Sequence, residues 1–195
     1  MKLLRGCSGK EVAPVTVEQA KDLFQTLTAS YFAGANVVFA NQSRVPMQGV
    51  PLVVLTPGPV HRPSNPTYED IGGERIGNYL SRFSITVDLF TNGSPVKDEE
   101  TGEVLAYADS AEDDLLAFVD FLGSDYVIDW SHNKDVAVLI EGDVQSLTAV
   151  VNDSTYQYRA RVTALFYFTH RTVGRAAVLK ESSIKYPTGQ IDPET

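Results

Sequence analysis

The chain is poor in the residues that most often carry chemistry. Its 195 residues include one cysteine, Cys7, and three histidines. A single cysteine excludes a disulfide within the chain, so packing must hold the fold, and synthesis in a reducing compartment is the simpler assumption. His61, His132 and His170 have no second ligand residue at metal-site spacing, which favours surface or hydrogen-bonded histidines. We therefore expect neither a metal nor another cofactor.

Positive charge and long apolar runs are also scarce. Sixteen Lys and Arg stand against twenty-five Asp and Glu, a formal net charge of −9. A protein that grips nucleic acid through a basic patch has the opposite balance, so we expect any contact with nucleic acid to be passive or local. No stretch approaches the roughly 20 apolar residues of a membrane helix, and residues 1–12 lack the apolar core of a signal peptide. These absences predict a soluble cytosolic product with no membrane partner.

Catalytic motifs are not evident. The segment GCSGK at 6–10 is too short between its glycines for a phosphate loop, and Glu11 stands where Ser or Thr is required. The chain has no G-x-S-x-G elbow, and Cys7 has no nearby His to activate it. The acidic clusters at 98–103 and 112–114 are typical of a solvated loop and of a helix N-terminus. We predict that the protein is not an enzyme; a hydrolase with an unconventional site is the least favoured alternative.

What the chain does have is the composition of a globular protein, with 43% hydrophobic and 21% charged residues. Its length is enough for one domain with a real hydrophobic core. We expect a single domain over residues 1–195, with a core at about 16–173 and a C-terminal arm or tail over 174–195.

Two segments have the pattern of amphipathic helices. The first begins at Thr16, with the capping-box residue Gln19 three places later, and ends at Gly34. The second begins at Ser110, carries acidic residues in its first turn and ends at Gly123. Their apolar stripes are Ala20, Leu23, Phe24, Leu27 and Tyr31 in the first, and Leu115, Phe118, Val119 and Leu122 in the second.

Short β-branched runs bounded by Pro, Gly and Asn predict strands. These runs lie at 36–42, 51–58 and 135–153. Residues 125–130 are interpreted as a short strand or turn, residues 57–73 as a long ordered loop or arm, and residues 94–109 as a projecting polar loop. Helices alternate with groups of strands joined mostly by turns. This order predicts an α+β fold in which a mainly antiparallel sheet with long strands has two helices packed on one face.

The segments 80–90 and 156–168 are about twice as long as an average strand of roughly 5–6 residues. The first alternates apolar residues with polar ones, the pattern of a half-buried sheet. In the second the alternation stops at Ala164, and ALFYF is apolar on both faces. Burial on two sides requires a covering partner from the same subunit or from another. A solvated face with scattered charges explains the first segment equally well, but we favour a role in assembly for the pair.

If these two strands are neighbours, Asp88 could meet Arg159 or Arg161 across the sheet. We expect a surface pair worth at most about 1 kcal/mol. Because the arginines lie on the polar face of a long strand, Arg159→Glu or Arg161→Glu should harm assembly more than folding.

Four segments in order along the chain give the sequence a family likeness. They are MQGVPLVVLTPGPVHR (47–62), RFSITVDLFTNG (82–93), YADSAEDDLLAFV (107–119) and YQYRARVTALFYF (156–168). The first is a short loop that leads into a strand and a Pro-containing arm, and the second is a strand that ends in a Val-Asp-aromatic pattern and a turn. The third is the helix that follows, and the fourth is a last strand rich in aromatic residues and Arg. Over about residues 16–173 the sequence resembles the neck and tail-terminator proteins of tailed bacteriophages.

The resemblance implies a structural subunit of a six-fold ring at the end of the tail tube or at the head-to-tail junction. Such a ring stops tube growth, binds the tail tube protein and the head–tail connector or head-completion protein, and lets DNA pass through its bore without specific binding. The implied location is the virion, after assembly in the host cytoplasm. The alternative is another virion connector, a baseplate protein or a tail-tip adaptor. The candidate assembly contacts are Arg82, Asp88, Arg159, Arg161 and Tyr167.

Overall fold

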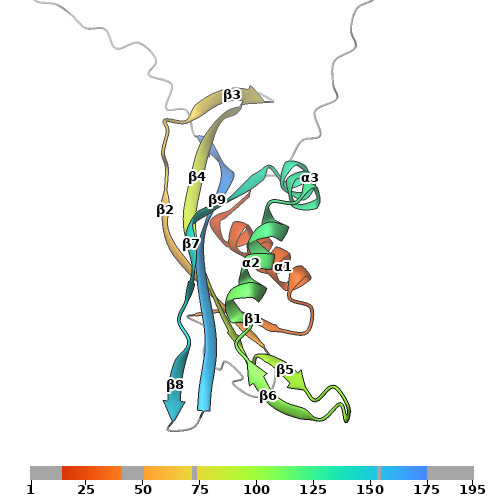
Figure 1. Cartoon of the computed structure of the whole chain (residues 1–195). Coiled ribbons are helices and arrows are strands. Elements are labelled where there is room, and N and C mark those ends of the chain that lie inside the picture. The colour runs from red at the N-terminus through yellow and green to blue at the C-terminus, as the bar shows by residue number, and fades with distance from the viewer. Residues whose placement is uncertain (1–14, 41–50, 72–73, 153–154, 175–195) are drawn as a thin grey trace, which may run out of the picture.

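The fold is built on one large sheet, with helices on one side of it and a small hairpin at one end (Figure 1). The computed structural model describes residues 15–40, 51–71, 74–152 and 155–174. In chain order the elements are α1 (Val17–Tyr31), β1 (Asn36–Phe39), β2 (Leu52–His61), β3 (Thr67–Ile71), β4 (Glu74–Thr91), β5 (Ser94–Lys97), β6 (Val104–Ala108), α2 (Ala111–Leu122), α3 (Asp125–Lys134), β7 (Val136–Ser146), β8 (Ala149–Asn152) and β9 (Thr155–Gly174).

The main sheet has the order β1-β2-β4-β9-β7, with β3 paired to β4 and β8 paired to β9. Only the β1–β2 pair is parallel among the described strands. The two longest strands, β4 with 18 residues and β9 with 20, are antiparallel neighbours along almost their whole length. The predicted fold class, a mainly antiparallel α+β structure with long strands, is confirmed.

The capping box predicted at the start of α1 is present. The Gln19 amide donates to the Thr16 hydroxyl at 3.2 Å, and the Thr16 amide donates to the Gln19 side-chain carbonyl at 2.9 Å. These two bonds satisfy donors that the first turn of a helix leaves unpaired. Gly34 follows the helix with φ +96°, which glycine adopts without strain. Both ends of α1 therefore follow from local sequence.

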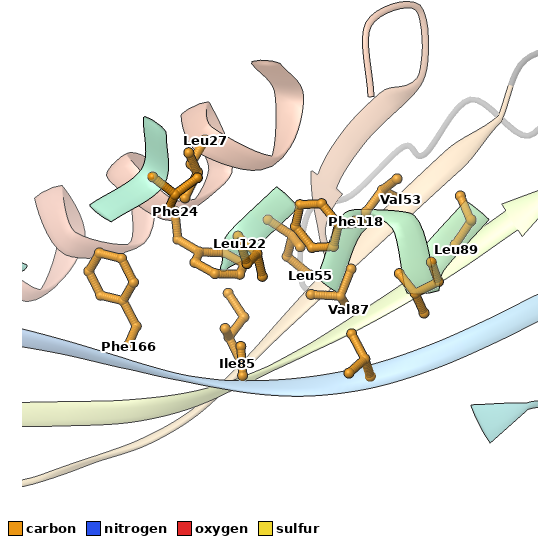
Figure 2. Packing of buried hydrophobic residues seen from close by; sticks show 14 of the residues in the cluster. Phe24, Leu27, Val53, Leu55, Ile85, Val87, Leu89, Phe118, Leu122 and Phe166 are labelled. Atoms are coloured by element: carbon orange, nitrogen blue, oxygen red, sulfur yellow. The ribbon is translucent and has the colours of Figure 1, made fainter. Parts of the chain in front are cut away.

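The core lies between the helices and the inward face of the sheet (Figure 2). Phe24 of α1 meets Phe166 of β9 edge to face, with ring centroids 5.7 Å apart. Phe118 of α2 is fully buried, as are Ile85 and Val87 of β4. Alternate residues of each long strand are buried on this side, as the period of a strand requires.

Three segments differ from their predictions. Residues 125–130 belong to helix α3, which Ser124 caps by accepting from the Val127 amide at 3.4 Å and which ends where Asp135 adopts φ 55°. The expected polar loop contains the β5–β6 hairpin, and the expected Pro-rich arm is largely strand, because β2 continues to His61 and β3 pairs with β4. In α3 only Val127 and Ser131 are buried, so no apolar stripe marks it in the sequence.

Several predictions fall outside the described residues. These are the predictions for Cys7 and the GCSGK segment, for the last two residues of the strand expected at 36–42, and for the C-terminal arm beyond Gly174. Within the described part of the chain, no helix is both long enough and apolar enough to cross a membrane.

Candidate assembly face of the sheet

One face of the sheet lacks a helical cover in the described chain. The three helices lie on the other side of the sheet (Figure 1). Because successive residues of a strand point to opposite faces, the side chains of β4 and β9 that alternate with the core residues lie on this side. We call it the open face. It is made of Leu80, Arg82, Ser84, Thr86 and Asp88 from β4, Arg159, Arg161, Thr163, Leu165 and Tyr167 from β9, and Leu139 from β7. All five predicted assembly contacts lie on it.

Asp88 is held between two arginines of β9. Arg161, its direct cross-strand partner, donates from Nε to Oδ1 at 2.8 Å and from Nη2 to Oδ2 at 3.1 Å. Arg159 donates to the same Oδ1 from Nε at 3.2 Å and from Nη2 at 2.9 Å. The Asp88 side chain is only 6% exposed, whereas the Arg159 and Arg161 side chains are 31% and 39% exposed. The predicted contact is confirmed, but its carboxylate is buried rather than on the surface.

The bond to Asp88 changes the pKa of Arg161, and Arg159 makes further contacts of its own. The hydrogen bond to Asp88 is the main cause that raises the pKa of Arg161 above its ordinary value, partly offset by burial. The Arg159 guanidinium lies over the Phe90 ring, 4.9 Å from its centroid. The Arg159 amide donates to Thr148 Oγ1, and that hydroxyl donates to Asp109 Oδ2 at 2.5 Å. Sequence reasoning missed this link, since no local pattern joins residues 109, 148 and 159.

Arg82 and Tyr167 form a second cross-strand pair. The Arg82 guanidinium donates from Nη1 to the Tyr167 hydroxyl at 3.0 Å, and its carbon lies 5.8 Å from the centre of that ring. This pair lies six residues from Asp88 along β4, roughly 20 Å away. The structure therefore brings the five candidate residues together in two groups. Each group is held in place by contacts inside the subunit.

Apolar side chains lie between and beside these groups. The sequence predicts cover on both faces for ALFYF. In the structure, one side of this segment is buried in the core through Ala164, Phe166 and Phe168. On the other side, Leu165 and Tyr167 are half-buried on the open face. Leu139, opposite Leu165 in the register, is 54% exposed, and Leu80 is 43% exposed. A hollow of about 220 Å³ adjoins them at the edge of the sheet, lined by Leu80 and Tyr167 and also by Ser131 and Asp135 at the end of α3.

The β5–β6 hairpin is a second exposed feature, projecting beside the lower end of the sheet in Figure 1. All residues of its strands are exposed, including the apolar Val96, Val104, Leu105 and Tyr107. The hairpin is tied to the sheet where Tyr158 donates its hydroxyl to the Tyr107 carbonyl at 2.9 Å. The sequence predicts a polar loop here, although the continuous apolar run Val-Leu-Ala-Tyr-Ala at 104–108 is the available signal for a strand.

The tip of the hairpin is an ordered turn. Asp98 accepts hydrogen bonds at one carboxylate oxygen from the Thr101 amide, the Thr101 hydroxyl and the Glu100 amide, at 2.8 to 3.0 Å. These bonds, the one from the Thr101 amide first, lower the pKa of Asp98. The acidic cluster at 98–103 is thus an internally bonded turn on the described hairpin.

Catalytic geometry is not found in the described part of the chain. No group of three or more His, Cys, Asp or Glu among those residues could hold a metal ion. A cleft of about 350 Å³ lies between the end of α1 and the start of α2, with Tyr31, Phe32 and Asp114 in its lining. Burial, followed by the charges of Asp114 and Asp120, raises the pKa of Tyr31, which keeps this phenol neutral. Among the described residues, the lining of this cleft holds no histidine or thiol that could act as a base or nucleophile beside Tyr31.

The histidines are separated in the structure as they are in the sequence. His61 and His132 are exposed. The His170 ring nitrogen Nδ1 lies 3.3 Å from the Val15 carbonyl oxygen, within hydrogen-bond distance.

Comparison with known families assigns the chain. A family model described as phage neck terminator protein matches residues 19–190, which is most of the 195-residue sequence. The chain belongs to this family. The resemblance seen in the sequence is thereby confirmed, and the match extends from α1 through the whole of the described sheet. A comparison with curated proteins gives no match.

Membership of the phage neck terminator family supplies the coarse function. The protein is a bacteriophage structural protein of the neck, located in the tail and neck region of the virion, and such a protein associates with other tail and head proteins. The open face and the hairpin are two described surfaces of this neck terminator protein that expose apolar side chains beside charged ones.

Proposed function

We propose that this neck terminator protein is a single domain that assembles with copies of itself into a closed six-membered ring at the end of the tail tube. The ring caps the tube, stops its growth and joins it to the head–tail connector or head-completion protein. DNA passes through its bore without specific binding, a role consistent with the formal net charge of −9. Assembly takes place in the host cytoplasm.

The observation that carries this proposal is the open face. Long paired strands present Arg82, Arg161 and Tyr167 on a surface without a helical cover in the described chain. Contacts inside the subunit already restrain these side chains, so binding a partner there costs less extra side-chain entropy than ordering free ones. A ring of identical subunits needs a heterologous contact, in which such a face meets a different face of its neighbour.

Both ends of the subunit extend beyond the layer of helices. At one end β3 pairs with the first part of β4, and at the other the β5–β6 hairpin projects (Figure 1). Such extensions suit contact with objects stacked above and below a ring, here the tube and the connector. The exposed apolar residues of the hairpin support this use, because a two-stranded hairpin alone is only marginally stable in water.

Electron microscopy of the purified protein tests the proposal directly. We expect closed rings with six-fold symmetry, and immunogold labelling at the neck of purified virions. Phages that lack the protein should carry abnormally long tails or fail to join heads to tails. A protein that stays monomeric at all concentrations and is absent from virions, or that is labelled at the baseplate, would contradict the proposed role.

A further inference from the structure

The open face carries positive charge in a protein that is acidic overall. Between residues 80 and 91 of β4 and 158 and 169 of β9 it holds Arg82, Arg159 and Arg161 against a single carboxylate, Asp88. These residues of β4 and β9 sum to a formal charge of +2, and exposed Glu141 of β7, opposite Thr163 on the same face, lowers the sum for the face to +1. Half-buried Leu165 and the exposed Leu139 lie beside the charges. A partner for this face should be acidic and should also carry apolar side chains.

Helices α2 and α3 present that combination on the opposite side of the subunit. They hold six exposed carboxylates and one lysine, Lys134, a formal charge of −5. Three large apolar side chains lie among them: Leu116 is 44% exposed, Tyr126 60% and Ile128 58%. We call the exposed side of α2 and α3 the acidic helical surface. Its carboxylates are Glu112, Asp113, Asp114, Asp120, Asp125 and Asp129.

The two surfaces lie on opposite sides of the sheet (Figure 1). Like surfaces of two copies would repel each other, because each pairing would bring together charges of one sign. Unlike surfaces combine opposite charges with apolar side chains. The hollow of about 220 Å³ at the edge of the open face, lined by Leu80 and Tyr167 and also by Ser131 and Asp135 at the end of α3, leaves room for a side chain of the partner. That volume is below the roughly 300 to 1,000 Å³ of small-molecule sites.

We infer that the open face of each subunit binds the acidic helical surface of a second copy of this chain. This inference rests on the proposed ring and names the two surfaces that form its repeating contact. Because the contact joins opposite sides of the subunit, it is heterologous, and a rotation repeats it around a closed ring. The arginines of the open face then lie inside the wall of the ring, where they do not face the DNA.

Charge reversal on the helices tests the contact. In Asp120→Lys/Asp129→Lys both changed residues are exposed, and a lysine at 120, in the last turn of α2, suits the helix dipole. We expect this variant to fold normally and to need about a tenfold higher concentration for half-maximal ring formation, because it places like charges in the contact. Asp22→Lys, an exposed reversal on α1, is the matched control and should assemble as the unchanged protein does.

Arg82→Glu tests the other side of the contact. It should weaken ring formation similarly, and combining it with Asp120→Lys/Asp129→Lys should disrupt assembly less than the sum of the separate effects, since the reversed charges again attract. Sedimentation velocity gives the ring fraction, and circular dichroism with urea unfolding checks the fold.

If the double lysine variant forms rings as readily as Asp22→Lys, the inference is wrong although the ring stands. If the unchanged protein forms no ring, the proposed function itself fails. Loss of duplex DNA binding in Arg82→Glu with intact rings would assign the open face to DNA and overturn the inference.

Discussion

At the scale of single residues, Asp88 shows how one buried carboxylate organises two strands. It accepts four hydrogen bonds from Arg159 and Arg161 while its own side chain is 6% exposed. A surface ion pair contributes at most about 1 kcal/mol, but removing one member of a buried pair leaves the others without a partner and costs more. The sequence predicts the pairing from charge and alternation, on the condition that the two strands are neighbours. It does not predict the burial, which arises because two long arginine side chains cover one short aspartate.

Replacing Asp88 with Asn should lower the free energy of unfolding by about 2 kcal/mol, because two partly exposed guanidinium groups would lose their carboxylate. Urea unfolding followed by circular dichroism gives this value. Asp113→Asn, at an exposed position, is the control and should change stability by less than about 0.5 kcal/mol. Equal stability of the two variants would mean that the Asp88 cluster contributes nothing to the fold.

The structure also changes the expectation for charge reversal in β9. Since Arg161 binds Asp88 through two hydrogen bonds, Arg161→Glu places a second carboxylate beside a buried one. We expect Arg161→Glu to lower the urea midpoint of unfolding markedly, so the effect of this substitution on assembly cannot be separated from its effect on folding. Arg82→Glu loses a hydrogen bond to the Tyr167 hydroxyl and a contact with the Tyr167 ring, and should lower the free energy of unfolding by no more than about 1 kcal/mol. A larger loss for Arg82→Glu than for Arg161→Glu would contradict this order.

At the scale of elements, local patterns predicted what local physics determines. The capping box of α1, the apolar stripe of α2 and the alternation of β4 are periodic in sequence, and each is present in the structure. Helix α3 was missed because only two of its ten residues are buried, leaving no stripe to detect. The β5–β6 hairpin was missed because its strands are exposed on both faces. The candidate residues were found from charge on long strands, whereas their partners required the register of β4 against β9.

Gly93 marks the point where β4 passes into the hairpin. Its φ is +81°, and a Cβ there would collide with the Ala108 carbonyl oxygen and the Tyr158 ring. Gly93→Ala should therefore cost about 2 to 3 kcal/mol and loosen the hairpin, which limited proteolysis would detect as faster cleavage at residues 94–108. Gly102→Ala separates the cost of the positive φ from the cost of the collision, because Gly102 has φ +71° but open space around it. It should cost about 1 kcal/mol.

The hairpin tip should respond to acid through Asp98. Its pKa in the folded turn lies below its ordinary value of 3.8, so the carboxylate stabilises the turn fully above that value and loses this effect as the pH falls through the lowered pKa. Carbon-13 NMR of the Asp98 carboxyl should show the lowered value. Thr101→Ala removes the hydroxyl bond but keeps the amide bonds, so it should raise the pKa only part of the way. No change in Thr101→Ala would exclude a contribution from the hydroxyl.

At the scale of the whole molecule, the distribution of charge predicts how assembly responds to salt. If the open face binds the acidic helical surface, part of the attraction acts between exposed charges and is screened when the Debye length falls from about 10 Å at 0.1 M to about 3 Å at 1 M. The concentration for half-maximal ring formation should rise between 0.1 M and 1 M sodium chloride, as measured by sedimentation velocity. Asp120→Lys/Asp129→Lys should show a weaker dependence on salt. Assembly that strengthens in salt would mean that apolar contacts dominate.

The central place of β9 has a consequence during synthesis. This strand is the last described element, yet it pairs with β4, β7 and β8 and supplies Arg159, Arg161 and Tyr167. Its partners in β4 lie about 67 to 99 positions earlier, so most of the chain must leave the ribosome before the sheet can close. A chain cut short before β9 lacks the residues that β9 contributes to the open face, Arg159, Arg161 and Tyr167 among them. Prematurely terminated products therefore cannot enter the proposed ring through this face, and only a nearly full-length chain is competent to join it.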